Sequence, residues 1–172
     1  AMTESNATPL SPFYYRDNYQ RLCDTVEAQY GDILGDDERK LLQVFRALTF
    51  NAQCLYVRLI SRTGPWFRES KLAYAELGSV TPLVDELLAN GMAVAATALD
   101  AQELGKLFTR GELQQMFASL GHTKLADKPA LLLAIDQLAL DADATLLAIA
   151  ALDSGRIVAP LGVEFTQLLQ LL

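Results

Sequence analysis

The sequence predicts a mainly α-helical protein with a few short strands. Apolar side chains recur every three to four residues over most of the chain, as they do along one face of a helix. Residues that start and stop helices bound many of these stretches, among them the capping box Thr109-Arg110-Gly111-Glu112. Only two short segments, near residues 66–70 and 92–96, have the composition of strands.

The first half of the chain predicts helices separated by short strands. We expect helices over residues 14–31, 36–48, about 52–63, 72–77 and 81–90, and strands over 66–70 and 92–96. Gly64-Pro65 ends the third helix, and Pro82 suits the first turn of the last one. From the third helix on, the order is helix, strand, helix, helix, strand. This is the order of a winged-helix variant of the helix-turn-helix, a module that binds duplex DNA.

The second half predicts a helical hairpin followed by further helices. The capping box at Thr109 starts a helix that Gly121 stops, and Asp127 caps the next helix, which has Pro129 in its first turn. Residues 144–152 and 163–172 are further helical segments. We therefore divide the chain into a loose tail, a winged-helix-like domain, a helical hairpin and a helical extension, over residues 1–12, 13–98, 99–140 and 141–172.

Composition is typical of a globular protein: 51% of the 172 residues are apolar, 20% are charged, and the formal net charge is −7. No apolar run is long enough to span a membrane. Cys23 and Cys54 are too few for a disulfide framework and fit reduced, packed thiols in a cytoplasmic protein. With His122 as the single histidine, they cannot supply the four ligands of a structural zinc site.

The two ends of the chain differ from natural termini. Ala1 before Met2 resembles the scar of a removed expression tag, and the chain stops on the apolar residues Leu171 and Leu172. The last segment either packs back on this protein or belongs to a longer one. The scar favours the longer protein.

One basic run stands out in this acidic chain. Residues 58–74 carry a net charge of +3 and include the single tryptophan, Trp66. Arg58 and Arg62 lie four residues apart on one helix face. On a strand, Arg68 and Ser70 point to the same side, next to Lys71. Such cations, hydroxyls and helix-terminal N–H groups bind phosphates. The alternative is a solvated face with Trp66 in the core.

Other motifs give weaker signals. The second half holds Lys106, Arg110, Lys124 and Lys128 opposite Glu103, Glu112 and Asp127, which is only a mild excess of positive charge. Glu69-Ser70-Lys71 matches the end of a nuclease metal motif, but the nearest upstream acids, at residues 36–38, lie at a helix start. His122 has no nucleophile near it in any motif. We therefore expect no catalytic and no metal site.

Three segments carry a family resemblance: Y-Y-R-D-N-Y-Q-R-L, L-Y-V-R-L-I-S-R-T-G-P-W-F-R-E-S-K-L-A-Y-A-E-L and V-T-P-L-V-D-E-L-L-A-N-G-M. Over residues 14–95 the chain resembles the N-terminal half of the bacterial Fanconi-associated nucleases. Residues 107–136 are similar to the SAP module, a DNA-binding helical hairpin, that follows in this family. The chain departs from the SAP pattern at residues 126–129, where Gly and two basic residues are usual.

The resemblance implies the DNA-binding part of a structure-specific nuclease that acts on 5′ flaps and in interstrand cross-link repair. The catalytic part of the family is a VRR-NUC domain of the PD-(D/E)XK type that depends on Mg²⁺ or Mn²⁺. No segment of this chain matches that domain, so we expect no cofactor here.

The implied partners are DNA and the remaining domains of the nuclease, with no membrane and with a nucleoid-associated location in the cytoplasm. The residues carried over as DNA contacts are Arg58, Arg62, Arg68, Ser70, Lys71, Tyr14, Tyr15, Arg110, Lys124 and Lys128. The alternative function is a protein-interaction scaffold that docks other domains or a repair partner.

Overall fold

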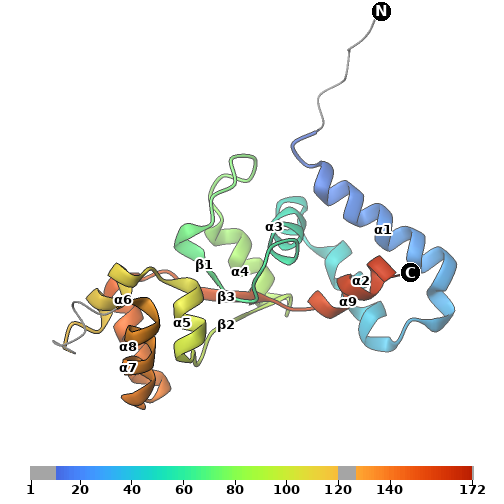
Figure 1. The fold of residues 1–172 in the computed structure, drawn as a ribbon. Coiled ribbons are helices and arrows are strands. Elements are labelled where there is room, and N and C mark those ends of the chain that lie inside the picture. The colour runs from blue at the N-terminus through green and yellow to red at the C-terminus, as the bar shows by residue number, and fades with distance from the viewer. Residues whose placement is uncertain (1–10, 120–126, 172) are drawn as a thin grey trace, which may run out of the picture. The chain divides into compact units, whose positions relative to one another are not determined.

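The computed structural model describes residues 11–119 and 127–171. Within these ranges the chain forms nine α-helices, two short 3₁₀ helices and one three-stranded sheet (Figure 1), which confirms the predicted mainly helical class. The helices are α1 (Tyr14–Tyr30), α2 (Asp36–Ala47), α3 (Phe50–Ile60), α4 (Thr81–Ala89), α5 (Ala101–Leu107), α6 (Arg110–Met116), α7 (Lys128–Gln137), α8 (Ala142–Leu152) and α9 (Val163–Leu171). The 3₁₀ helices are η1 (Gly31–Ile33) and η2 (Glu69–Lys71), and the strands are β1 (Phe67–Arg68), β2 (Ala93–Ala95) and β3 (Ile157–Pro160).

The chain forms two compact units that are not continuous in sequence. Unit 1 contains residues 1–63, 73–93 and 160–172, and unit 2 contains residues 64–72 and 94–159. The division expected from the sequence, near residues 98 and 140, follows the order of the chain. The observed units instead group segments that pair over long distances in sequence, such as β1 and β3.

The sheet has the strand order β1-β3-β2. Strand β1 pairs antiparallel with β3, with Phe67 opposite Val158 and Arg68 opposite Ile157. Within the predicted helical extension over residues 141–172, the helical segments expected at 144–152 and 163–172 correspond to α8 and α9, and β3 lies between them, where the sequence predicted no strand. All four residues of β3 are buried, so the segment has no alternating pattern by which a strand is recognised.

A second correction concerns residues 66–77. The predicted strand is only two residues long and passes into η2, and residues 72–77 form no α-helix. Tyr74 instead makes a β-bridge with Gly78, whose φ of +64° suits glycine. The turn between Tyr74 and Gly78 thus takes the place of the predicted short helix. Leu72 and Leu77, whose spacing indicated that helix, are both buried.

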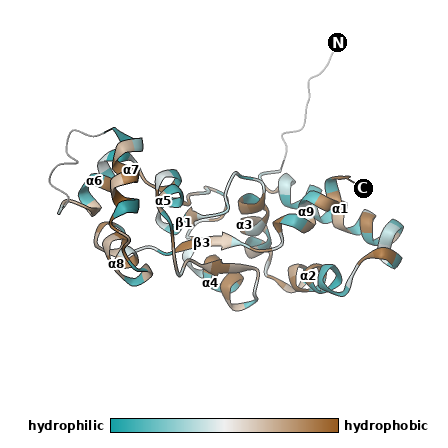
Figure 2. Cartoon of the chain, turned by 60° about the horizontal axis from the view of Figure 1, so that its bottom comes forward, coloured by the Kyte–Doolittle hydropathy of each residue, from teal (hydrophilic) through white to brown (hydrophobic). Residues whose placement is uncertain are grey.

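The core of unit 1 is built around α3, between α1 and α4. Thr49 caps α3 by accepting a hydrogen bond from the Ala52 backbone N–H, which confirms the expected break between α2 and α3. Tyr56, wholly buried on α3, donates a hydrogen bond of 2.7 Å to the Leu161 carbonyl and so ties the segment before α9 to this core. On helix α2, Leu42 and Phe45 are buried in this core, and hydrophilic residues, drawn teal in Figure 2, make up much of the rest of the helix.

The core of unit 2 joins α5 to α7 and α6 to α8. Both α5 and α6 start with complete capping boxes, at Asp100 and Thr109, and Asp127 caps α7. The expected caps at Thr109 and Asp127 are thus confirmed. Wholly buried Leu113 and Leu131 lie at the centre of this core. None of the described helices is long and apolar enough to cross a membrane.

Candidate nucleic-acid interface

The basic run divides between the two units. Arg58 lies near the end of α3 and Arg62 just beyond it, in unit 1, whereas Arg68, Ser70 and Lys71 lie on β1 and η2, in unit 2. Each group is therefore a candidate surface of its own unit.

In unit 1, Arg58 is part of a cluster with Tyr15, Arg62, Tyr74 and Glu76, here named the Arg58 cluster. Its Nη2 and Nε donate to the same oxygen of Glu76, Oε2, at 2.7 and 3.1 Å. The Tyr15 hydroxyl donates to that oxygen as well, at 2.7 Å. Glu76 therefore fixes the position of the Arg58 guanidinium.

Two tyrosine rings flank the same guanidinium. Its carbon Cζ lies 4.1 Å from the ring centre of Tyr15 and 5.1 Å from that of Tyr74. Arg62 donates from Nη1 to the Tyr74 hydroxyl at 2.8 Å. The Arg58 side chain keeps 37% of its surface exposed, and Arg62 is exposed. This arrangement presents two cations and a phenol to solvent.

The ionisation of the Arg58 cluster is well defined. Burial alone would raise the pKa of Glu76, but the hydrogen bonds from Tyr15 and Arg58 outweigh it and lower that pKa. The hydrogen bond to Glu76 raises the pKa of Arg58, and burial raises the pKa of Tyr15 above its usual range. At neutral pH the cluster thus contains an anionic Glu76, a cationic Arg58 and a neutral Tyr15.

In unit 2, Arg68 is buried rather than exposed. It forms the Arg68 cluster with Ser70, Phe108, Glu112 and Asp153. Its side chain is 8% exposed and makes ion pairs with Glu112 at 3.0 Å and with Asp153 at 3.1 Å. Its Cζ also lies 4.4 Å from the ring centre of Phe108. This corrects the expectation of a solvent-facing Arg68, because two carboxylates and a ring enclose its guanidinium.

Ser70 points to the same carboxylate as Arg68. Its hydroxyl donates to Asp153 Oδ2 at 2.5 Å, and Arg68 Nε donates to that oxygen at 3.2 Å. The shared direction of the two side chains is as predicted, but it is toward an acid of the protein. Their role as DNA contacts stays a prediction. What the observed contacts indicate is that they hold β1, η2 and the end of α8 together.

The two acids of the Arg68 cluster are held in their ionised form. The backbone N–H of Thr109 is the main cause that lowers the pKa of Glu112, and Arg68 adds to it. For Asp153, burial acts in the opposite direction, but hydrogen bonds from Ser70, the Gly155 backbone and Arg68 together lower the pKa. The Arg68 cluster therefore contains one cation and two anions.

Lys71, unlike Arg68, is exposed, at the end of η2. The neighbouring Glu69 is buried and pairs with Arg156 of the β3 segment at 2.6 Å. A carboxylate paired in this way is not placed to hold a metal ion. Within residues 11–119 and 127–171, no three potential ligands from His, Cys, Asp and Glu come together.

The other predicted contacts lie at helix starts. Tyr14 is 47% exposed on the first turn of α1, while Tyr15 is half-buried in the Arg58 cluster. Arg110 and Lys128 are the half-buried first residues of α6 and α7. Lys124 and His122 lie outside the described residues. All these contacts stay predictions.

Sequence reasoning missed the partners that decide what each arginine does. Glu76, Glu112 and Asp153 lie 18, 44 and 85 residues from the arginines that they bind. No local pattern marks these pairs. For Glu76 a signal did exist, because it belongs to the segment K-L-A-Y-A-E-L on which the family resemblance rests.

Comparisons with known proteins show which proteins this chain resembles. Residues 13–94 match the family model described as the FAN1 HTH domain. The chain is 39% identical over 115 residues to a Fanconi-associated nuclease 1 homolog of Pseudomonas aeruginosa, which covers 66% of this chain and 21% of that protein. It is 30% identical over 108 residues to Fanconi-associated nuclease 1 of Homo sapiens, covering 61% of this chain and 11% of that protein.

Solved structures show the same similarity in three dimensions. A crystal structure of paFAN1 bound to 2-nucleotide 5′ flap DNA with a gap superposes with a TM-score of 0.82 and 29% identity. The match covers 96% of this chain and 30% of that chain. A second one, of paFAN1 bound to 1-nucleotide 5′ flap DNA with a gap, has a TM-score of 0.72. The present chain thus spans less than a third of the length of the proteins it matches.

Proposed function

Because this chain belongs to the Fanconi-associated nuclease 1 family, we propose that it is the DNA-binding part of a nuclease that acts on 5′ flaps. The observation that carries the proposal is the structural match over 96% of the chain to a relative in complex with 5′ flap DNA. The match of residues 13–94 to a helix-turn-helix domain supports it independently.

The proposed mechanism is neutralisation of backbone phosphates with little reading of bases. Arg62 and Lys71 are exposed, and Arg58 keeps 37% of its side chain exposed. Contacts of this kind position a duplex but carry no sequence information, and their strength falls steeply with salt. This suits a protein that recognises the form of a DNA junction.

The chemistry of cleavage belongs to the whole nuclease. We propose a VRR-NUC domain with Mg²⁺ or Mn²⁺ as its catalytic part, outside this chain, and a location with the DNA. The pairing of Glu69 with Arg156 supports this assignment, because it leaves the Glu69-Ser70-Lys71 segment without a free carboxylate. When bound, the metal ion would activate the attacking water and stabilise charge on the phosphate.

The test is the double variant Arg62→Ala plus Lys71→Ala, assayed by fluorescence anisotropy with a labelled 5′ flap duplex. We expect weaker binding and a salt dependence lower by about two units, one for each lost phosphate contact. The thermal midpoint should stay nearly the same, because both side chains are exposed.

The matched control is Arg21→Ala plus Lys40→Ala, which removes two other exposed cations and gives the same net charge. It should leave binding close to that of the original protein. Equal weakening by both double variants would show that only net charge matters, and unchanged binding by the first would remove the proposed interface.

A further inference from the structure

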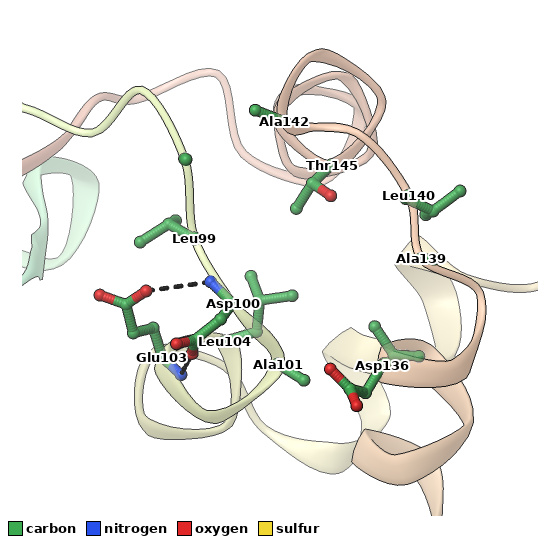
Figure 3. Close-up of a pocket in the computed structure, with 12 residues that line it drawn as sticks. Leu99, Asp100, Ala101, Glu103, Leu104, Asp136, Ala139, Leu140, Ala142 and Thr145 are labelled. Atoms are coloured by element: carbon green, nitrogen blue, oxygen red, sulfur yellow. Dashed lines mark hydrogen bonds between the residues drawn. The ribbon is translucent and has the colours of Figure 1, made fainter.

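Unit 2 has a groove between α5 and α7 that reaches the start of α8. Figure 3 shows the end nearer to α8, where Asp136 of α7 and Ala101 of α5 lie on one side and Ala142 and Thr145 of α8 lie on the other. A second hollow along α5 and α7 shares Asp100, Ala101 and Asp136 with the first. The two hollows therefore adjoin each other, and we name them together the α5–α7 groove.

The groove has an apolar lining that the protein leaves exposed. On α7, Leu131 and Ile135 pack into the core of unit 2, whereas Leu133, on the side toward the groove, is 59% exposed. Leu140, in the turn after α7, is 43% exposed at the other end. Large apolar side chains gathered along one groove are typical of protein interaction sites.

The polar part of the lining is acidic. Asp100, Glu103 and Asp136 contribute carboxylates, and no lysine or arginine is among the described residues that line the groove. Asp100 and Glu103 already accept each other's backbone N–H groups in the capping box, drawn as dashed lines in Figure 3. Asp136 is exposed and forms no ion pair with any described residue, so its charge is available to a partner.

We propose that the α5–α7 groove binds a cationic amphipathic peptide segment of another protein. An apolar side chain of the peptide would cover Leu133 next to half-buried Leu132, and a lysine or arginine would pair with Asp136. A helix laid in a groove supplies both kinds of side chain at intervals of three and four residues.

Charge distinguishes a cationic peptide from two other possible occupants of the groove, DNA and a second copy of this chain. DNA phosphates would meet the carboxylates of Asp100 and Asp136, which repel them. A second copy of this chain has a formal net charge of −7 and is disfavoured in the same way. A cationic segment is the partner whose charge complements the groove. This function is separate from the proposed DNA binding, which uses cations.

The test uses a fluorescein-labelled peptide of about 14 leucine and lysine residues, with the leucines spaced by three and four. Leu133→Gln should weaken its binding about tenfold, because it removes an apolar contact. Asp136→Asn should weaken it about threefold, as expected for an exposed ion pair. A peptide with glutamate in place of lysine should not bind.

The matched controls are Leu147→Gln and Asp143→Asn on α8, neither of which is among the residues that line the groove. Leu147 is 72% exposed and Asp143 is exposed, so both variants should fold and bind the peptide as before. Equal weakening by the control variants would reduce the binding to general attraction by an acidic surface and would overturn the proposal.

Two further measurements test whether a second copy of this chain or DNA occupies the groove instead. In sedimentation equilibrium, self-association that Leu133→Gln abolishes would assign the groove to a second copy. Weaker binding of the flap duplex by Asp136→Asn would assign it to DNA. Either result would overturn the peptide proposal. Unchanged DNA binding together with weaker peptide binding supports it, whether or not the proposed DNA interface proves correct.

Discussion

Two arginines from one basic run end in opposite environments. Arg58 faces a single carboxylate, stacks on two tyrosines and keeps 37% of its side chain exposed. Arg68, ten positions later, faces two carboxylates and a phenylalanine ring and is 8% exposed. Arg58 can still contact a phosphate, whereas the guanidinium of Arg68 is already paired with acceptors of its own unit.

This difference shows that a cluster of cations in a sequence is not yet a cationic surface. Two acids around one arginine leave the site with a net negative charge, and burial gives that arginine a structural role. An arginine with one acid and an open side stays available. The number of carboxylates and the exposed fraction separate the two roles, and each can be altered by mutation.

The largest effect is expected from Arg68→Met. Met fills similar space but leaves Glu112 and Asp153 without their cation, so unit 2 should lose about 3 kcal/mol of stability. The value is at the low end for a buried pair, because Glu112 and Asp153 keep 24% and 13% of their side chains exposed. Urea unfolding followed by fluorescence of the single tryptophan, Trp66, measures it, since Trp66 packs on the core of unit 2.

Two further variants test whether the loss comes from unpaired buried charge. Lys71→Met, at an exposed site of the same run, should change the unfolding free energy by less than about 0.5 kcal/mol. Adding Glu112→Gln and Asp153→Asn to Arg68→Met should recover part of the loss, because the cost comes from unpaired charge. A loss below about 1 kcal/mol for Arg68→Met would place Arg68 in the same class as Arg58.

A smaller effect is expected on acidification. The pKa values of Glu112 and Asp153 are lowered by folding, so their ionised forms stabilise the folded state above their unfolded pKa values, which are about 4. This stabilisation is lost as the pH falls from about 4 through the folded values. The free energy of unfolding, measured by Trp66 fluorescence between about pH 6 and 3, should therefore fall more steeply with decreasing pH in the original protein than in Arg68→Met. If stability depends on pH in the same way in both proteins, Arg68 is not what lowers the pKa values of these two acids.

Much of the fold could be predicted from local patterns. The caps at Thr109 and Asp127 lie where the sequence placed them, since a cap depends only on residues within one turn. Strand β3 could not be found in this way. Its four residues are all buried, and two of them pair with β1, about ninety positions earlier. Ile157 and Val158 are β-branched, but an apolar run of four residues without alternation is too short to identify a strand.

The candidate site was predicted only in outline. The sequence showed that cations gather at residues 58–71, because charge can be counted. It could not show which cations are neutralised, because Glu112 and Asp153 reach Arg68 across 44 and 85 residues through the fold of unit 2. Exposure is a property of tertiary packing, and for this site it decides the function.

Among the variants within the two clusters, Glu76→Gln should lower stability least, and it tests the comparison from the side of Arg58. Gln keeps the shape of Glu76 and can still accept from Tyr15 and Arg58, so unit 1 should lose only about 1 kcal/mol. The lost negative charge releases the cation of Arg58. If Arg58 contacts phosphate, affinity for the flap duplex should rise and the salt dependence should increase by about one unit.

Glu164→Gln, an exposed site of the same unit, makes the same change in net charge and should leave affinity nearly constant. Equal gains from both variants would assign the effect to overall charge, whereas weaker binding by Glu76→Gln alone would mean that Arg58 needs Glu76 to hold it in place.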